Sequence, residues 1–196
     1  MDAIVRLLVP LAVLAGGFGA AVPITPDLAY IRNGTCLNVR PQASLNYGQF
    51  AGRWVEVSSR PNEFRQARQC VNMHFIITED TPLRITTGIN TDHEMTEVVT
   101  RMRPQETQSS FIIELHGLET GTFDVLDTDY DNLACVYQCQ QATPNAKVEW
   151  AYVYARNLKQ SEEAEKRCRK VFLSRGFDVE SLVRSPHPDE TCNTAI

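Results

Sequence analysis

The chain has 196 residues, 43% hydrophobic and 22% charged, which suits one compact domain and excludes a disordered chain. Its 19 lysines and arginines against 24 acidic residues give a net charge of −5, which argues against a nucleic-acid partner. Six cysteines, an even number, indicate disulfides and an oxidising compartment.

The N-terminal residues have the pattern of a secretory signal peptide. Arg6 precedes an apolar run over residues 7–15, and small residues follow as far as Ala21. The apolar run is shorter than the ~20 residues that a membrane-spanning helix needs. We therefore predict a signal peptide over residues 1–21, a single domain over residues 22–196, and a secreted protein without a membrane span. Asn33 then begins an Asn-Gly-Thr sequon for N-glycosylation.

Short segments rich in Val, Ile, Thr, Phe and Tyr follow from residue 53, separated by turn residues. Turn signals at about 8–12-residue spacing are typical of an antiparallel β-sandwich or β-barrel. The pattern predicts an all-β domain with eight strands, at residues 53–60, 70–79, 83–90, 94–103, 110–116, 121–128, 133–140 and 148–156.

One helix is predicted after the last strand. Ser161 is a candidate N-cap, acidic residues follow it, and Gly176 is a stop signal. The apolar residues fall on one face at helical spacing, so this face should pack on the sheet. They are Ala164, Cys168, Val171 and Phe172.

Alternation within the strands separates two faces. In residues 148–156 one face carries small side chains, which would allow the helix to pack closely against it. The other face carries Trp150, Tyr152 and Tyr154. Such an aromatic face either fills the core or lines a pocket, because a closed eight-stranded barrel can just hold one small ligand. In the strand at 94–103 two inward sets fit equally well: Met95 with Val99, or Val98 with Met102.

The cysteines and the other reactive residues show no metal or catalytic pattern. Cys135 and Cys139 lie about 13 Å apart along one strand, too far for the ~7 Å that a disulfide allows. Cys168, on the apolar face of the helix, should instead reach one of them. Metal-binding CxxC and HxxxH spacings are absent, and so are nucleophile-elbow and HExxH motifs. We predict no metal site and no enzyme activity.

Three short motifs resemble those of the lipocalins and follow the order and spacing of that family. They are Gly52-Arg53-Trp54, Thr128-Asp129-Tyr130, and Arg156 just before the helix. The resemblance covers about residues 36–192. It implies an eight-stranded antiparallel up-and-down barrel around a calyx, with one C-terminal helix packed outside. It also implies that Trp54 plugs the barrel floor and that Arg156 lies across its indole.

Residues 128–139 and Cys168 narrow the resemblance to the arthropod crustacyanins, which are carotenoid-binding lipocalins; apolipoprotein D and the insect bilin-binding proteins are also similar. The resemblance implies three disulfides, Cys36–Cys139, Cys70–Cys192 and Cys135–Cys168. The implied function is binding and transport of a small hydrophobic ligand, with a carotenoid such as astaxanthin as the first candidate. A homodimer, or a heterodimer with a related lipocalin, is a further implied partner.

Alternatives to a carotenoid carrier remain open. The ligand could be a retinoid, sterol, fatty acid or bilin, or the protein could act by binding another protein at its surface. An enzyme resembling prostaglandin synthase is a further alternative, and it would need a free inward cysteine.

The expected ligand residues combine positions that match family ligand positions with neighbours of the same strand parity. They are Met73, Phe75, Ile85, Thr87, Ile89, Phe111, Phe123, Trp150 and Tyr152. Ile89 stands where apolipoprotein D has a glutamate. The resemblance therefore implies a pocket with mostly hydrocarbon walls.

Overall fold

A computed structural model describes residues 31–61, 65–76 and 82–192. The predicted signal peptide lies outside the described residues, and so does the end of the strand predicted at 70–79.

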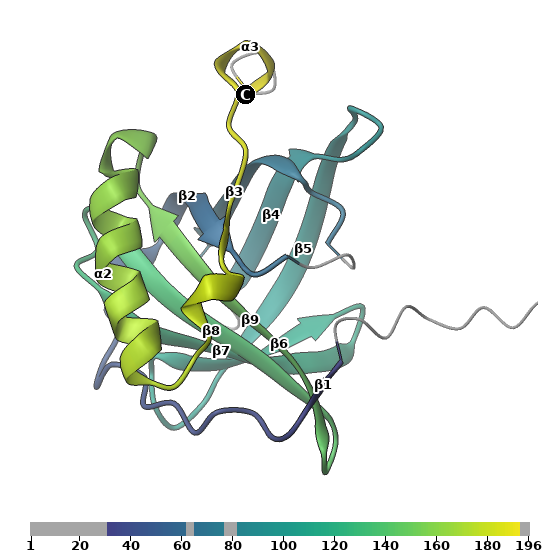
Figure 1. Cartoon of the computed structure of the whole chain (residues 1–196), viewed down its shortest axis with the longest axis vertical. Coiled ribbons are helices and arrows are strands. Elements are labelled where there is room, and N and C mark those ends of the chain that lie inside the picture. Colours follow the sequence, from purple (N-terminus) through teal and green to yellow (C-terminus); the bar gives the residue numbers. More distant parts are fainter. Residues whose placement is uncertain (1–30, 62–64, 77–81, 193–196) are drawn as a thin grey trace, which may run out of the picture.

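Eight long antiparallel strands form the barrel (Figure 1). They are β2 (Gly52–Ser59), β3 (Gln69–Ile76), β4 (Leu83–Ile89), β5 (Met95–Pro104), β6 (Ser110–Leu115), β7 (Leu118–Thr128), β8 (Leu133–Thr143) and β9 (Ala146–Ala155). Each strand pairs with the next along the chain, and β9 pairs back onto β2. Because that last pairing leaves neither strand as an open edge, the sheet closes. The predicted eight-stranded up-and-down barrel is confirmed.

Short elements decorate this barrel. Two-residue strands extend the sheet, β1 (Arg32–Asn33) beside β9 and β10 (Val183–Arg184) beside β2. A one-turn helix, α1 (Tyr47–Phe50), leads into β2, and α3 (Asp189–Cys192) lies near the end of the described chain. Two 3₁₀ turns, η2 (Leu158–Gln160) and η3 (Val179–Ser181), flank the main helix in sequence.

The main helix, α2 (Ser161–Ser174), lies along the outside of β8 and β9 (Figure 1). Ala164, Cys168 and Phe172 are its fully buried residues, whereas Val171 is only partly buried. Arg167 adds a bidentate ion pair to Asp127 of β7, at 2.6 and 2.7 Å. The predicted N-cap is wrong by one residue. The chain enters α2 directly from η2, so Ser161 is already helical.

Strand parity sorts the buried residues into two clusters. The cluster inside the barrel contains the aromatic face of β9, and the cluster under α2 contains its small face, Ala151, Val153 and Ala155. In β5 the inward set includes Met102, which is 2% exposed, while Met95 and Val99 are about half exposed. The structure therefore selects Val98 with Met102 from the two sets left open by the sequence.

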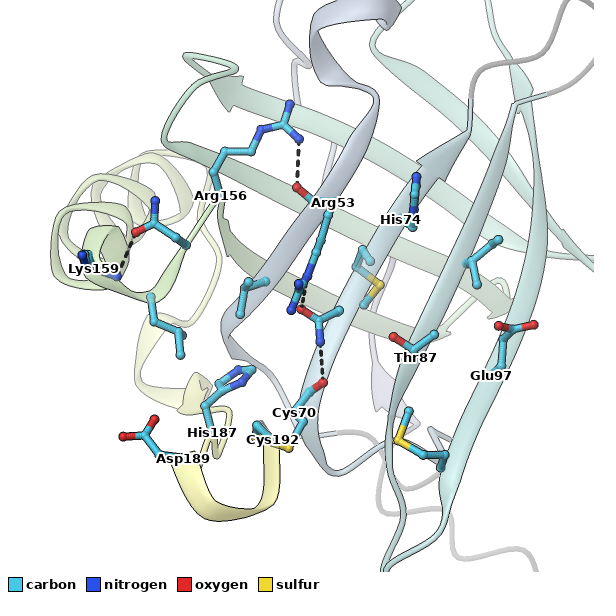
Figure 2. A pocket seen from close by; sticks show the side chains of 17 residues that line it. Arg53, Cys70, His74, Thr87, Glu97, Arg156, Lys159, His187, Asp189 and Cys192 are labelled. Atoms are coloured by element: carbon cyan, nitrogen blue, oxygen red, sulfur yellow. Dashed lines mark hydrogen bonds between the residues drawn. A yellow bond between two sulfur atoms is a disulfide. The ribbon is translucent and has the colours of Figure 1, made fainter. Parts of the chain in front are cut away.

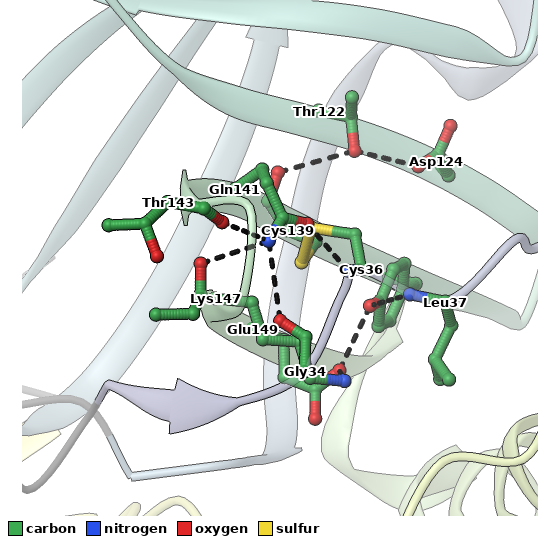
Figure 3. The surroundings of a disulfide bond; sticks show 12 residues. Gly34, Cys36, Leu37, Thr122, Asp124, Cys139, Gln141, Thr143, Lys147 and Glu149 are labelled. Atoms are coloured by element: carbon green, nitrogen blue, oxygen red, sulfur yellow. Dashed lines mark hydrogen bonds and ion pairs between the residues drawn. A yellow bond between two sulfur atoms is a disulfide. The ribbon is translucent and has the colours of Figure 1, made fainter.

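All six cysteines are paired as the resemblance implied: Cys36–Cys139, Cys70–Cys192 and Cys135–Cys168. The first bridge ties the N-terminal segment to β8, and Gln141 lies beside it (Figure 3). The Gln141 side chain accepts a hydrogen bond from the Cys36 amide and donates to the carbonyl oxygen of Ala146. Asn33 of the sequon is exposed in β1. None of the helices in the described ranges is long and apolar enough to cross a membrane.

Candidate functional site

The closed end of the barrel is plugged by Trp54. Its side chain is fully buried, and its indole Nε1 donates a 2.8 Å hydrogen bond to the carbonyl oxygen of Phe50. Gly52, two residues earlier, has φ +88°, a backbone conformation that residues with a Cβ rarely adopt. The motif thus combines a glycine that turns the chain out of α1 with an indole that fills the floor.

Arg156 covers this plug. Its guanidinium carbon lies 3.8 Å from the centre of the Trp54 ring, as the resemblance implied. Such a contact adds roughly 0.5–2 kcal/mol of cation–π attraction. The three guanidinium nitrogens also donate four hydrogen bonds of 2.6–3.0 Å to backbone carbonyl oxygens. The acceptors are the carbonyl oxygens of Gln49, Ala51, Arg53 and Tyr130. The arginine therefore joins three separate segments at the closed end.

The second motif forms the turn between β7 and β8. The Asp129 carboxylate accepts hydrogen bonds from the amides of Asn132 and Leu133, at 2.8 and 3.0 Å. Partial burial raises the pKa of this carboxyl, but the hydrogen bonds from Leu133 and Asn132 outweigh burial, so the net shift is downward. This turn presents the Tyr130 carbonyl to Arg156.

Aromatic rings fill the lower barrel above the plug. Phe50 lies against both Trp54 and Phe75, with ring centres 5.3 and 4.9 Å apart. Phe123 lies 5.8 Å from Phe75 and 6.3 Å from Phe111. All five rings are at most 2% exposed. This half of the interior is packed core.

A cavity of about 480 Å³ occupies the interior above the aromatic layer. Met73, Trp150 and Tyr152 supply apolar wall, together with Ala67 of the β2–β3 connection and Leu115 at the end of β6. The volume is in the range of sites that hold a small molecule, roughly 300–1,000 Å³. This cavity is the candidate ligand site.

Part of the cavity wall is polar. Arg84 of β4 points inward, is 7% exposed, and lies beside Thr100 and Gln138. Its guanidinium carbon is 5.3 Å from the ring centre of Phe123, so it lies between the cavity and the aromatic layer. Most of the wall area is apolar, as predicted, but β4 contributes a polar strip. The inward positions of β4 carry arginine, threonine and glycine.

A buried ion pair lies beside the same wall. Glu56 is fully buried, forms an ion pair with Arg65, and accepts hydrogen bonds from the hydroxyls of Ser59 and Ser185. Burial raises the pKa of Tyr152, although the positive charges of Arg84 and Arg65 oppose that shift. The stacked ring of Tyr154 lies 5.7 Å away and has its pKa raised for the same reason. Both phenols are therefore uncharged at neutral pH.

The nine expected ligand residues divide into three groups. Met73, Trp150 and Tyr152 line the cavity, and Phe75, Phe111 and Phe123 lie in the packed layer below it. The third group comprises the β4 residues Ile85, Thr87 and Ile89.

The prediction that Ile85 and Thr87 point into the barrel is wrong. These two residues pair across the sheet with His74 and Asn72, which point outward. Arg84 pairs with Phe75, which points inward. The apolar side chains of β4 thus lie on the outer face, so the parity carried over from the family ligand positions is wrong for this strand. Ile89 shares that parity. It is buried opposite Gln69 and Met95, and it is not among the described residues that line the cavity.

A second, larger hollow of about 890 Å³ lies on the outside of β2–β5. Figure 2 shows Thr87 and Glu97 in this outer groove, with His187 and Cys192 of the C-terminal segment lining it. Arg53, Glu97 and Lys159 are exposed charges there, so water screens them. The walls of the two hollows are similarly apolar, and we take the interior as the candidate ligand site because the closed sheet surrounds it.

Sequence reasoning missed Arg84, Thr100 and Gln138 as interior residues. The alternation of Arg84, Thr86 and Gly88 was visible, but polar alternation normally marks the face turned to solvent. The convergence of β4, β5 and β8 on one guanidinium depends on the barrel register, which no short motif encodes.

Comparisons with known proteins agree with this architecture. The sequence model of the lipocalin / cytosolic fatty-acid binding protein family matches residues 51–189. Apolipoprotein D of Macaca fascicularis is 25% identical over 182 residues, covering 91% of this chain and 93% of that protein. The crustacyanin-A1 subunit of Homarus gammarus is 20% identical over 141 residues, covering 71% of this chain and 78% of that protein. The structure of lobster apocrustacyanin A1 superposes with a TM-score of 0.72 at 18% sequence identity, covering 82% of this chain and 93% of that chain.

A closed antiparallel barrel with a plugged floor and an interior cavity defines a small-molecule-binding β-barrel protein. The family match makes the assignment specific, because it covers well over half of the chain. The chain belongs to the lipocalin family. Family and cavity together support binding of a small hydrophobic molecule.

Proposed function

We propose that the protein is a secreted carrier that holds one small hydrophobic molecule inside the barrel. The single observation that carries this proposal is the interior cavity of about 480 Å³, bounded by Met73, Trp150 and Tyr152 above a packed aromatic layer. Apolar area supplies affinity in such a site, and sparse polar groups orient the ligand. A barrel filled by side chains throughout would carry no such function.

Secretion is supported by the N-terminal pattern of residues 1–21 and by the pairing of all six cysteines. N-glycosylation at Asn33 is part of the same proposal, since that side chain is exposed. A homodimer, or a heterodimer with a related lipocalin, is proposed from the resemblance to crustacyanins alone.

The ligand class is the finer part of the proposal. The resemblance to the crustacyanins supports a carotenoid, and the alternatives are a retinoid, sterol, fatty acid or bilin. We propose a carrier and not an enzyme. All six cysteines are bonded to one another, so a prostaglandin-synthase-like reaction would have no thiol nucleophile.

The test combines identification with titration. Lipid extracted from protein purified from its native source is identified by mass spectrometry. Stripped protein is then titrated with astaxanthin, retinol and a fatty acid while tryptophan fluorescence is followed. Trp150 in the cavity wall should report an occupied site. Saturable quenching by at least one compound is the expected result. Quenching by none of them would favour action through the outer surface.

A further inference from the structure

We infer that the ligand carries a carboxylate and that Arg84 binds it at the base of the cavity, an inference that rests on the proposed carrier function. The structure places a guanidinium in the ligand site without an acidic partner among the described residues. A neutral ligand would leave that charge uncompensated.

The position of Arg84 is fixed by the barrel. It pairs across the sheet with Phe75 on one side and with Thr100 on the other, and both partners lie on the inward face. Its Nε donates to the Thr100 hydroxyl at 3.2 Å, and its Nη1 donates to the Gln138 side-chain oxygen at 3.3 Å. Both acceptors are neutral. Among the described residues, no hydrogen bond from Nη2 is found, so this nitrogen is available to a ligand.

The neighbouring groups do not neutralise this charge. Glu56 is already matched by Arg65 and by two serine hydroxyls. Tyr152 and Tyr154 are uncharged at neutral pH, because burial raises the pKa of each phenol. The described residues that line the cavity include two arginines and one histidine but no aspartate or glutamate. The site is therefore electropositive.

A carboxylate fits this environment better than a hydroxyl or a ketone. Burial of a charge without a counter-charge is strongly unfavourable, and a carboxylate would supply the missing charge. The planar guanidinium donates parallel hydrogen bonds to two carboxylate oxygens, a geometry that a single neutral oxygen cannot match. Arg84 lies over Phe123, at the inner boundary of the cavity. The acid group should thus lie deepest, with the hydrocarbon tail directed past Trp150 toward the mouth.

The inference ranks the ligand classes differently from the resemblance to crustacyanins. Fatty acids, retinoic acid and bilins carry carboxylates, whereas sterols, retinol and astaxanthin do not. A long apolar acid is the class that the cavity wall and its charge jointly favour.

The test compares two ligands that share one hydrocarbon skeleton. Stripped full-length protein is titrated with retinoic acid and with retinol, and quenching of tryptophan fluorescence gives the two dissociation constants. We expect the acid to bind about tenfold more tightly or better, the scale of a charge-assisted hydrogen bond. Arg84→Gln should remove most of this preference. The variant should bind retinoic acid more weakly, while its dissociation constant for retinol should change by less than about twofold.

Arg101→Gln is the matched control. Arg101 lies on β5, next in sequence to Thr100, but its side chain is exposed outside the barrel. The same charge change there should alter neither dissociation constant. If both control and Arg84→Gln weaken the acid equally, the effect is one of overall charge, and the inference fails.

The two proposals fail in different ways. Equal affinity of the wild-type protein for acid and alcohol overturns the inference and leaves the carrier function standing. Failure to bind any retinoid, fatty acid, carotenoid, sterol or bilin overturns both. The wild-type comparison needs no variant. If Arg84→Gln does not fold, Arg84→Met supplies a second neutral side chain of similar length, and its expected result is the same loss of preference.

Discussion

At the closed end of the barrel, every guanidinium nitrogen of Arg156 donates to a backbone carbonyl oxygen, and the indole of Trp54 lies beneath it. Arg84, deeper in the barrel and more buried, has only two neutral side-chain acceptors at 3.2 and 3.3 Å. The closed end is thus complete as a folded structure. The cavity contains a charge that the described protein groups leave unbalanced, and the inferred carboxylate of the ligand would balance it.

The largest effect should come from the closed end. Trp54→Ala removes a fully buried indole and the partner of Arg156, so we expect the free energy of unfolding to fall by about 3–5 kcal/mol. Chemical denaturation at neutral pH measures the change. Trp150→Ala is the control from the cavity wall, and it should cost less because its ring already borders empty space. Equal losses for the two variants would contradict the division of the barrel into a packed end and a ligand-binding end.

An intermediate effect is expected in the turn that supports Arg156. Asp129→Asn removes the charge that accepts two backbone amides, and should cost about 1–2 kcal/mol at neutral pH. The pKa of Asp129 is lowered from 3.8 in the folded protein, so its stabilisation is present above that value. It is lost as the pH falls through the folded-state pKa.

The measurement is the stability difference between wild type and Asp129→Asn across pH 2–7, a range of about two units below to three above the ordinary value. The difference should shrink toward zero at the acidic end. A difference that stays constant with pH would contradict this prediction, because the loss of stability in Asp129→Asn would then not depend on the charge of the carboxylate.

The smallest effect concerns a polar atom between the two ends. The Tyr154 hydroxyl is buried, and no hydrogen-bond partner for it is found among the described residues. Tyr154→Phe removes that group without changing the ring, so stability should stay the same or rise by up to about 1 kcal/mol. Thermal unfolding of the stripped protein measures this. A loss of 1 kcal/mol or more would mean that the hydroxyl has a partner in solution, and a bound water is the first candidate.

The sequence predicted the barrel well because its strands, helix and motifs are local signals. Strand β9 was assigned correctly on both faces, since aromatic and small residues alternate along it without exception from Trp150 to Ala155. The pairing of Cys135 with Cys168 followed the resemblance and agreed with the helix face on which Cys168 lies.

The ligand site was predicted less well, and β4 shows why. The resemblance implied Thr87 and Ile89 as calyx positions, and the apolar Ile85 was added because it shares their parity, but the register of this barrel turns that face outward. The inner face of β4 instead carries Arg84 and Thr86, polar residues that line a cavity and not a core. Places where hydrophobic patterning fails in this way are expected at functional sites.

The central claim is that the ligand occupies the barrel interior, although the outer groove is the larger hollow. A crystal structure of the protein loaded with a small hydrophobic acid tests this most directly. We predict ligand density between Met73 and Trp150, with the acid oxygens within hydrogen-bonding distance of Arg84. Density in the outer groove beside Thr87 and Glu97, with an empty barrel interior, would contradict the account.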